Sequence, residues 1–346
     1  MNIDLESYFK GIKGPKNALT DVPGIQVGHV TISDGPIQTG VTAILPHSGN
    51  VFKEKVVAAS HVINGFGKSI GLIQVEELGT LETPIILTNT FGVGRASTGL
   101  VKYMLSQNPD IGRSTGTVNP VVFECNDGYI NDIRELIIEE NHVLEAIANA
   151  SEDFEQGAVG AGRGMCAFGL KGGIGSSSRI VNLSEEIYTL GVLVLANFGV
   201  LKTLNLGGRA IGEEILKRIE AETVSKAKPE DERGSIIIII GTDVPLSDRQ
   251  LKRIAKRVPA GMSKTGSYFG NGSGDIVLAF STANQVKHYP EQAIATVKQM
   301  NEAYIDTVFE AVIQATEESI YQALMNAETT IGRNERVVKS LKAYLE

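Results

Sequence analysis

The stretch GSIIIIIG, residues 234–241, contains five consecutive isoleucines between two glycines. β-branched side chains are stiff about χ1 and pack well on a pleated sheet. Because no polar residue alternates with the isoleucines, the stretch predicts a strand that is buried on both faces. The preceding residues 223–233 are rich in charge and contain Pro229, which indicates a solvated loop. Ser235 therefore lies where an exposed segment enters the core.

Ser235 has two interpretations at this point. In the first, Gly234 and Ser235 are only a turn before a strand, and the local pattern alone favours this reading. In the second, the bond between Gly234 and Ser235 is broken and Ser235 becomes a new N-terminal residue. Its α-amine, with a reference pKa of about 7.7–8.0, would then act as the base that activates its hydroxyl. The rest of the chain must decide between them.

The composition is that of an α/β protein with many tight turns: 346 residues, 42% hydrophobic and 21% charged, with 38 glycines. No repeat, low-complexity tract or linker divides the chain, which predicts one integrated domain over residues 1–346. The net charge of −8, without a stripe of lysines or arginines, argues against nucleic-acid and anionic-membrane partners. No apolar run reaches transmembrane length, and only two cysteines are present, so we expect a cytoplasmic protein without a disulfide framework.

Periodicity and turn signals predict an alternation of strands and helices along the chain. The expected strands cover residues 40–46, 84–89, 120–125, 192–197, 234–241 and 275–281. The expected helices cover residues 96–107, 130–150, 209–222, 249–258 and 291–326, the last of them in two pieces.

Nucleotide and metal sites are poorly supported by the sequence. Residues 157–179 contain eight glycines in 23 residues and first suggest a phosphate cradle. No Gly-Lys-Ser/Thr triplet follows, and a dinucleotide fingerprint fits only loosely, so we expect closely approaching backbones and keep nucleotide binding as a minor alternative. The five histidines lack metal-type spacing, and no Gly-x-Ser-x-Gly elbow is present. We therefore expect no metal and no other cofactor.

Polar residues at strand ends are better candidates for chemistry. Asn197 ends an apolar strand, where its amide could donate to a developing oxyanion. Ser273 and Asp275 open a strand at alternate positions, so their side chains point to the same side. Glu124, near the end of the 120–125 strand, could hold the ammonium group of a substrate. Taken singly, each of these residues could equally be a cap or a turn residue.

Nine segments of the chain occur in the order found in the P1-type peptidases, which the chain resembles from about Leu19 to Arg333. This family includes the L-aminopeptidase/D-esterase, also called D-aminopeptidase, and the β-peptidyl aminopeptidases. The segments are LTDVPGIQVGH, GVTAILP, LETPIILTNT, ECNDGYIND, FGLKGGIGSSSR, VLVLANFG, GSIIIIIGTDVPLS, NGSGDIVLAFST and AETTIGR. Nine segments in order are far more specific than any one of them.

The resemblance implies a four-layer αββα sandwich, similar to the N-terminal-nucleophile hydrolases, and a homo-oligomer, which we expect to be a tetramer or larger. It also implies autocatalytic cleavage before Ser235, which would give an α chain of residues 1–234 and a β chain of residues 235–346. The reaction would be hydrolysis of small peptides, amino-acid amides or esters through an acyl-enzyme on Ser235.

The resemblance carries over to site residues one by one. Asn197 matches the family's oxyanion asparagine, and Ser273 matches the serine that contacts the amine of the nucleophile. Asp275 stands where well-known members have glutamate, so its charge is kept but withdrawn by one methylene. Asn126 stands where some members have a tyrosine that assists the oxyanion. Glu124 matches an acid implicated in recognising the amino group of the substrate.

Two alternatives to a hydrolase remain open at the level of the sequence. One is an acyltransferase of the ornithine-acetyltransferase type, which shares the architecture but uses a threonine in an Ala-Thr-Met-Leu stretch that is missing here. The other is a non-catalytic binding protein whose chain stays uncleaved. The joint presence of Ser235, Asn197 and Ser273 argues against the second alternative.

Overall fold

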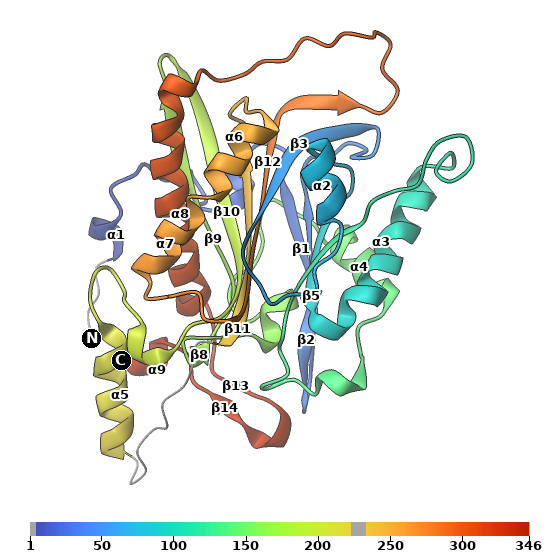
Figure 1. Ribbon diagram of the computed structural model, residues 1–346. Helices are drawn as coiled ribbons and strands as arrows, with labels where there is room; N and C mark the ends of the chain where they lie inside the picture. The colour runs from blue at the N-terminus through green and yellow to red at the C-terminus, as the bar shows by residue number, and fades with distance from the viewer. Residues whose placement is uncertain (1–4, 223–232, 346) are drawn as a thin grey trace.

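Two β-sheets packed face to face form the middle of the protein, and helices cover both outer faces, as the computed structural model shows (Figure 1). The structure describes residues 5–222 and 233–345. The four-stranded sheet has the order β1 (Gln26–Asp34), β2 (Ile37–Leu45), β5 (Ile85–Asn89) and β6 (Val121–Cys125). The six-stranded sheet has the order β4 (Thr80–Leu81), β3 (Glu54–Gly65), β12 (Gly272–Lys287), β11 (Arg233–Thr242), β10 (Glu186–Asn197) and β9 (Gly173–Leu183).

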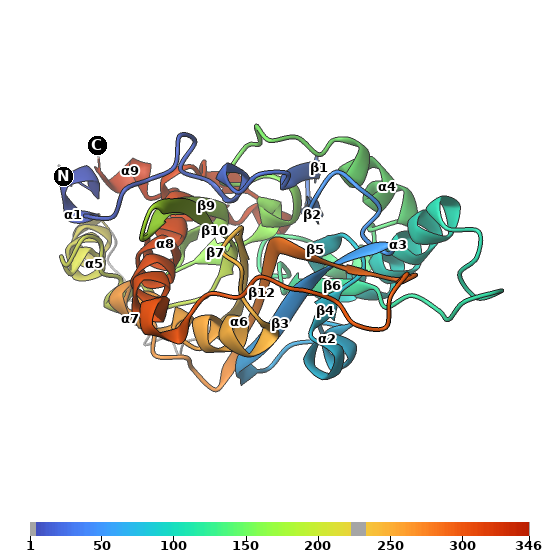
Figure 2. The same ribbon diagram turned by 90° about the horizontal axis from the view of Figure 1, so that it is seen from above.

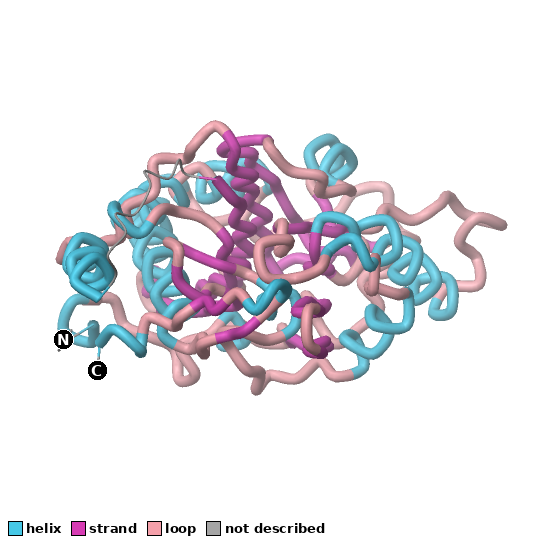
Figure 3. Tube along the Cα trace, turned by 90° about the horizontal axis from the view of Figure 1, so that it is seen from below, coloured by secondary structure: helices cyan, strands magenta, loops and turns pink. Residues whose placement is uncertain are grey.

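Helices, two sheets and helices form four layers, which Figure 2 shows from above and Figure 3 from below. Three hydrophobic cores lie between these layers. One core lies between the two sheets, one lies between the six-stranded sheet and its helices, and one lies between the four-stranded sheet and its helices. The helices beside the six-stranded sheet are α5 (Ile211–Glu222), α6 (Asp248–Ala255), α7 (Val258–Lys264) and α8 (Ile305–Met325). Those beside the four-stranded sheet are α3 (Val93–Gln107) and α4 (Glu140–Ala148). The expected four-layer αββα sandwich is confirmed.

The remaining elements are short. They are the helices α1 (Leu5–Tyr8), α2 (Leu72–Leu78) and α9 (Lys342–Leu345), and the strand pairs β7 (Cys166–Ala167) with β8 (Leu170–Lys171) and β13 (Thr330–Ile331) with β14 (Val337–Val338). Within residues 5–222 and 233–345, no helix combines the length and the apolar character needed to cross a bilayer.

Strand β11 divides its isoleucines between two cores. Ile236, Ile238 and Ile240 pack toward the helices, whereas Ile237 and Ile239 pack between the sheets, and all five side chains are fully buried. The strand pairs with β10 in antiparallel and with β12 in parallel orientation, so both of its edges are occupied. This arrangement confirms the strand that the sequence predicts, with both faces buried.

The expected helix over residues 291–326 is only partly correct, because α8 covers Ile305–Met325 and most of the preceding residues are not helical. Ile294 and Val297, which suggested an apolar helical face, are exposed by 84% and 61%. A helical face is stabilised mainly by the surface that it covers. Most of the surface of these two side chains faces solvent, because they lie on a segment that projects away from the sheets (Figure 1).

Two other expected helices are also shorter than predicted. Within residues 130–150 the helix is limited to α4, because Leu136 adopts a left-handed backbone with φ of +51° that ends the preceding 3-10 turn. Within residues 249–258 the helix α6 ends at Ala255, and a second helix, α7, starts at Val258 with Pro259 in its first turn. Proline is tolerated there because the first helical N–H groups have no partner within the helix.

Candidate active site

Ser235 and Asn197 are direct neighbours across the antiparallel β10–β11 ladder, where β10 ends and β11 begins. The residues two positions further inside, Ile237 and Leu195, pack in the core between the sheets. Because side chains alternate along a strand, Ser235 and Asn197 also face the space between the sheets. Both side chains are buried, with exposed fractions of 4% and 7%. The strand ends predicted from sequence therefore bring a hydroxyl and an amide together.

Gly234, just before this hydroxyl, has a backbone conformation that only glycine adopts without strain. Its φ is +138°, and a Cβ atom at this position would lie 2.0 Å from the carbonyl oxygen of Asn197. Any other residue would have to move the backbone of β10 or β11. The peptide bond between Gly234 and Ser235 is thus held tightly against the end of β10.

The side-chain amide of Asn197 is held from two sides. The backbone N–H of Cys166 donates to Asn197 Oδ1 at 2.9 Å, and Asn197 Nδ2 donates to the carbonyl oxygen of Asn126 at 3.0 Å. An amide nitrogen carries two hydrogens. One hydrogen of Nδ2 is used by Asn126, and the other can serve an oxyanion that forms beside Ser235.

Ser273 and Asp275 are adjacent to Ser235, but they lie on the opposite face of the sheet. The Ser273 hydroxyl donates to Asp275 Oδ1 at 2.6 Å, and both residues are buried. They alternate in register with Val277, which packs toward the helices, whereas the Ser235 hydroxyl faces the other sheet. In the parallel ladder, Ser273 stands beside Gly234. The pair therefore lies beside the Gly234–Ser235 junction, on the face of the sheet away from the Ser235 hydroxyl.

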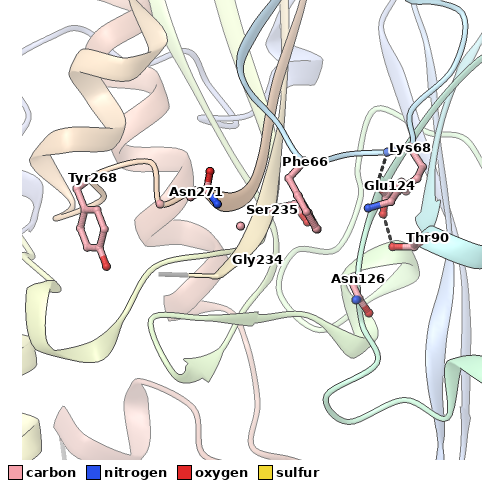
Figure 4. A pocket seen from close by; sticks show the side chains of 11 residues that line it. Phe66, Lys68, Thr90, Glu124, Asn126, Gly234, Ser235, Tyr268 and Asn271 are labelled. Atoms are coloured by element: carbon pink, nitrogen blue, oxygen red, sulfur yellow. Dashed lines mark hydrogen bonds between the residues drawn. The ribbon is translucent and has the colours of Figure 1, made fainter. Parts of the chain in front are cut away.

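A cavity of about 620 Å³ opens at this end of the sandwich, and residues of both sheets line it (Figure 4). Glu124, at the end of β6, lies across the cavity from Ser235. Its Oε1 accepts from the backbone N–H of Lys68 at 2.8 Å, and its Oε2 accepts from the Thr90 hydroxyl. A carboxylate offers about four lone-pair positions, so acceptor capacity remains for a cationic ligand.

Four of the predicted site residues line the cavity, namely Ser235, Gly234, Glu124 and Asn126. The other three, Asn197, Ser273 and Asp275, adjoin it from the sheet without lining it. Sequence reasoning missed further lining residues, which are Phe66, Lys68, Thr90, Tyr268, Gly270, Asn271 and Gly272. Thr90 follows a predicted strand directly, so its position at a strand end was a usable signal. The loop residues carried no comparable signal.

Cys125, beside Glu124, is not a competing nucleophile. Burial raises the pKa of its thiol well above the usual value, and the negative charge of Glu124 adds to that effect, whereas a hydrogen bond with Ser235 acts in the opposite direction. The thiol therefore stays neutral. In the described part of the chain, no group of three or more His, Cys, Asp or Glu side chains is arranged to hold a metal ion.

The model of peptidase family S58 matches residues 17–338 of this chain. The chain belongs to peptidase family S58. A family relative, the β-peptidyl aminopeptidase BapA of Sphingosinicella microcystinivorans, is 38% identical over an alignment that covers 98% of this chain and 88% of that protein. The P1-type resemblance seen in the sequence is thereby confirmed, and the protein is a hydrolase of the aminopeptidase class.

Solved structures similar to this family S58 chain agree on the fold. The PH0078 protein of Pyrococcus horikoshii OT3 superposes with a TM-score of 0.90 at 50% identity, covering 97% of this chain and 94% of that one. The L-aminopeptidase D-Ala-esterase/amidase of Ochrobactrum anthropi superposes with a TM-score of 0.88 at 33% identity, covering 96% and 93%. The latter is described as a serine aminopeptidase with a variant of the Ntn-hydrolase fold.

Proposed function

We propose that the chain cuts itself between Gly234 and Ser235 and then works as a serine aminopeptidase and amidase with Ser235 as its N-terminal nucleophile. The observation that carries this proposal is the junction itself. Gly234, at a φ of +138°, is pressed against the backbone of Asn197, and the hydroxyl that follows it stands beside the Asn197 amide. A buried strand start with no catalytic role would not require this combination.

The proposed self-cleavage proceeds by an N-to-O shift. Ser235 Oγ attacks the carbonyl carbon of Gly234, and the Asn197 amide stabilises the oxyanion. The C–N bond then breaks, the proton of the hydroxyl passes to the nitrogen, and an ester links the two pieces. Water hydrolyses this ester, which leaves a carboxylate on Gly234 and a free amine and hydroxyl on Ser235. The fragments 1–234 and 235–346 stay together because β11 remains paired with β10, and β12 with β3, across the two fragments.

In the proposed turnover, the freed α-amine of Ser235 acts as the general base. It takes the proton of the hydroxyl as Oγ attacks the substrate carbonyl, and then gives the proton to the departing amine or alcohol. Ser273 and Asp275, which lie beside the Gly234–Ser235 junction, orient that amine. Asn197 stabilises the oxyanion, and the Asn126 side chain, which lines the cavity, contributes to substrate binding. Water then releases the acyl group.

Glu124 supports a substrate with a free amino group. Its carboxylate lies opposite Ser235 in a cavity of about 620 Å³, where it can pair with the substrate ammonium. This size suits a small peptide, an amino-acid amide or an ester. We further propose, from the family resemblance, a homo-oligomer that is a tetramer or larger. From the composition we propose a cytoplasmic protein that needs no cofactor and binds neither nucleic acid nor a membrane.

The test is an intact-mass measurement of the freshly purified protein beside its Ser235→Ala variant. Cleavage of the 37.0 kDa chain should give pieces of about 25 and 12 kDa, in proportion to 234 and 112 of the 346 residues. The variant should stay whole, and Ser106→Ala, on the exposed end of α3, should cleave normally. A wild-type chain that stays intact and hydrolyses no amino-acid p-nitroanilide contradicts the proposal. Hydrolysis without an amine acceptor separates it from the acyltransferase alternative.

A further inference from the structure

Lys171 is a fully buried lysine. In the described structure, the hydrogen-bond acceptors of its ammonium group are all main-chain carbonyl oxygens. It lies in β8, within the glycine-rich segment of residues 157–179, and the neighbouring Gly172 packs against the backbone near the end of β10. Its Nζ donates to the carbonyl oxygens of Gly162 at 3.1 Å, Met165 at 2.6 Å and Gly172 at 2.8 Å. All three ammonium hydrogens are thus used.

One of these bonds leads directly to the candidate active site. The carbonyl of Met165 and the N–H of Cys166 belong to one planar peptide group. The oxygen of this group accepts from Lys171, and its N–H donates to Asn197 Oδ1 at 2.9 Å. A hydrogen bond to the oxygen also polarises the peptide group and strengthens its N–H as a donor. Two bonds and one rigid plane therefore connect the lysine to the Asn197 amide.

We propose that Lys171 is a positioning residue of the hydrolytic site: it fixes the Met165–Cys166 peptide group, which holds the Asn197 amide so that Nδ2 serves the oxyanion. This inference rests on the proposed role of Asn197. Without the ammonium, three carbonyls in the core lose a charged donor, and the peptide group can rotate away from Asn197. The amide of Asn197 would then lose one of its two restraints.

The test is a double-mutant cycle with Lys171→Met and Asn197→Ala. Lys171→Met should lower kcat for an amino-acid p-nitroanilide about tenfold to hundredfold and leave KM within about twofold, because the donor is misplaced but not removed. In the Asn197→Ala background the same substitution should have almost no further effect. Rates are expressed per mole of the cleaved 235–346 fragment. A wild-type kcat for Lys171→Met, or losses that multiply fully in the double variant, would overturn the inference.

Lys55→Met is the matched control, because Lys55 is also largely buried but lies at the other end of β3, away from the cavity. It should lower the free energy of unfolding without changing kcat. If Asn197→Ala itself keeps the wild-type kcat, the proposed role of Asn197 fails. If Asn197→Ala is impaired and Lys171→Met is not, only the present inference fails.

The pH dependence of kcat gives a second test that does not require Lys171→Met to fold. Burial lowers the pKa of the Lys171 ammonium to about 8; Arg163 acts in the same direction, and Cys166 and Asp127 act against it. Above that pH the neutral amine loses one donor, so wild-type kcat should fall on the alkaline side. Lys171→Arg, whose guanidinium stays charged, should remove this decline up to pH 10. A wild-type kcat that stays constant to pH 10 contradicts the inference.

Discussion

The end of the six-stranded sheet and the end of the four-stranded sheet meet at one cavity, yet they bring different chemistry to it. The first supplies a hydroxyl, an amide and the strained junction at Gly234, all fixed by backbone ladders on neighbouring strands. The second supplies the carboxylate of Glu124, which is held by a loop N–H and a threonine. In the proposed mechanism, residues of the six-stranded sheet carry out the acyl transfer, and Glu124 of the four-stranded sheet binds the amino group of the substrate. Substitutions in the two sheets should therefore affect different kinetic constants.

The largest effect is expected from Gly234→Ala, in the six-stranded sheet. The new Cβ would lie 2.0 Å from the Asn197 carbonyl oxygen, at a φ of +138°, so the junction must shift and cleavage should be abolished. Intact mass reads this directly. The control is Gly112→Ala, which also has a positive φ but open space around it, and which should cleave normally. Normal cleavage of Gly234→Ala would show that the junction geometry is not needed.

Asn197→Ala should have the next largest effect. Loss of one oxyanion donor costs on the order of 10²–10³ in kcat, with a much smaller change in KM. The measurement is steady-state kinetics on cleaved protein, with Asn182→Ala on the exposed part of β9 as the control. An insoluble or unfolded Asn197→Ala variant would assign the residue to the structure of the β10 end, and not to the chemistry.

Glu124→Gln tests the four-stranded sheet. A charge-assisted hydrogen bond contributes about 1.5–3 kcal/mol, so KM for a substrate with a free amino group should rise roughly tenfold to a hundredfold while kcat changes less. Glu82→Gln, another buried acid away from the cavity, is the control. If kcat falls and KM stays constant, Glu124 acts on the reaction and the division between the two sheets is wrong.

The smallest effect concerns Asp127, a buried acid three positions after Glu124 in the loop that follows β6. Burial raises the pKa of its carboxyl group to about 6, against hydrogen bonds from Thr39 and Asn131 that lower it. Folding thus favours the protonated form of Asp127. The contribution of this group to the free energy of unfolding is fully present below pH 4 and is lost as the pH rises through 6. Relative to Asp127→Asn, the wild type should become less stable between pH 4 and 7. Urea unfolding measures this, with Asp34→Asn as an exposed control.

The sequence predicted the parts of the site that follow from one strand. The isoleucine run indicated a strand buried on both faces, and Ser235, directly before the run, became the candidate nucleophile. Alternation predicted that Ser273 and Asp275 share a side, and their side chains are hydrogen-bonded. None of this needed knowledge of how the sheets pack, because a period of two is a property of the strand itself.

The sequence could not predict relations between segments that only the sandwich brings together. Which face of the sheet Ser273 occupies depends on the register of β12 against β11, and the position of Glu124 opposite Ser235 depends on how the two sheets close. Lys171 is visible in the sequence as part of the motif FGLKGG. Its hydrogen bonds to carbonyl oxygens of the glycine-rich segment depend on the backbone geometry of that segment, which the sequence does not show. The helix predicted over the residues before α8 was wrong for the same reason. Periodicity shows an apolar face, but it does not show whether another part of the fold packs against that face.

The place of β11 in the middle of its sheet has a thermodynamic consequence if the chain is cut at Ser235. Strands β10 and β12, which flank β11, then belong to different polypeptides, so complete unfolding becomes a dissociation of two chains. The melting temperature of the processed protein should then rise more steeply with protein concentration than that of the uncut Ser235→Ala chain, in which only the contacts between protomers of the proposed oligomer dissociate. Folding of each protomer from denaturant should likewise change from a first-order process to a second-order process that joins the two fragments. The cut would turn a protomer that folds from one chain into a protomer that assembles from two.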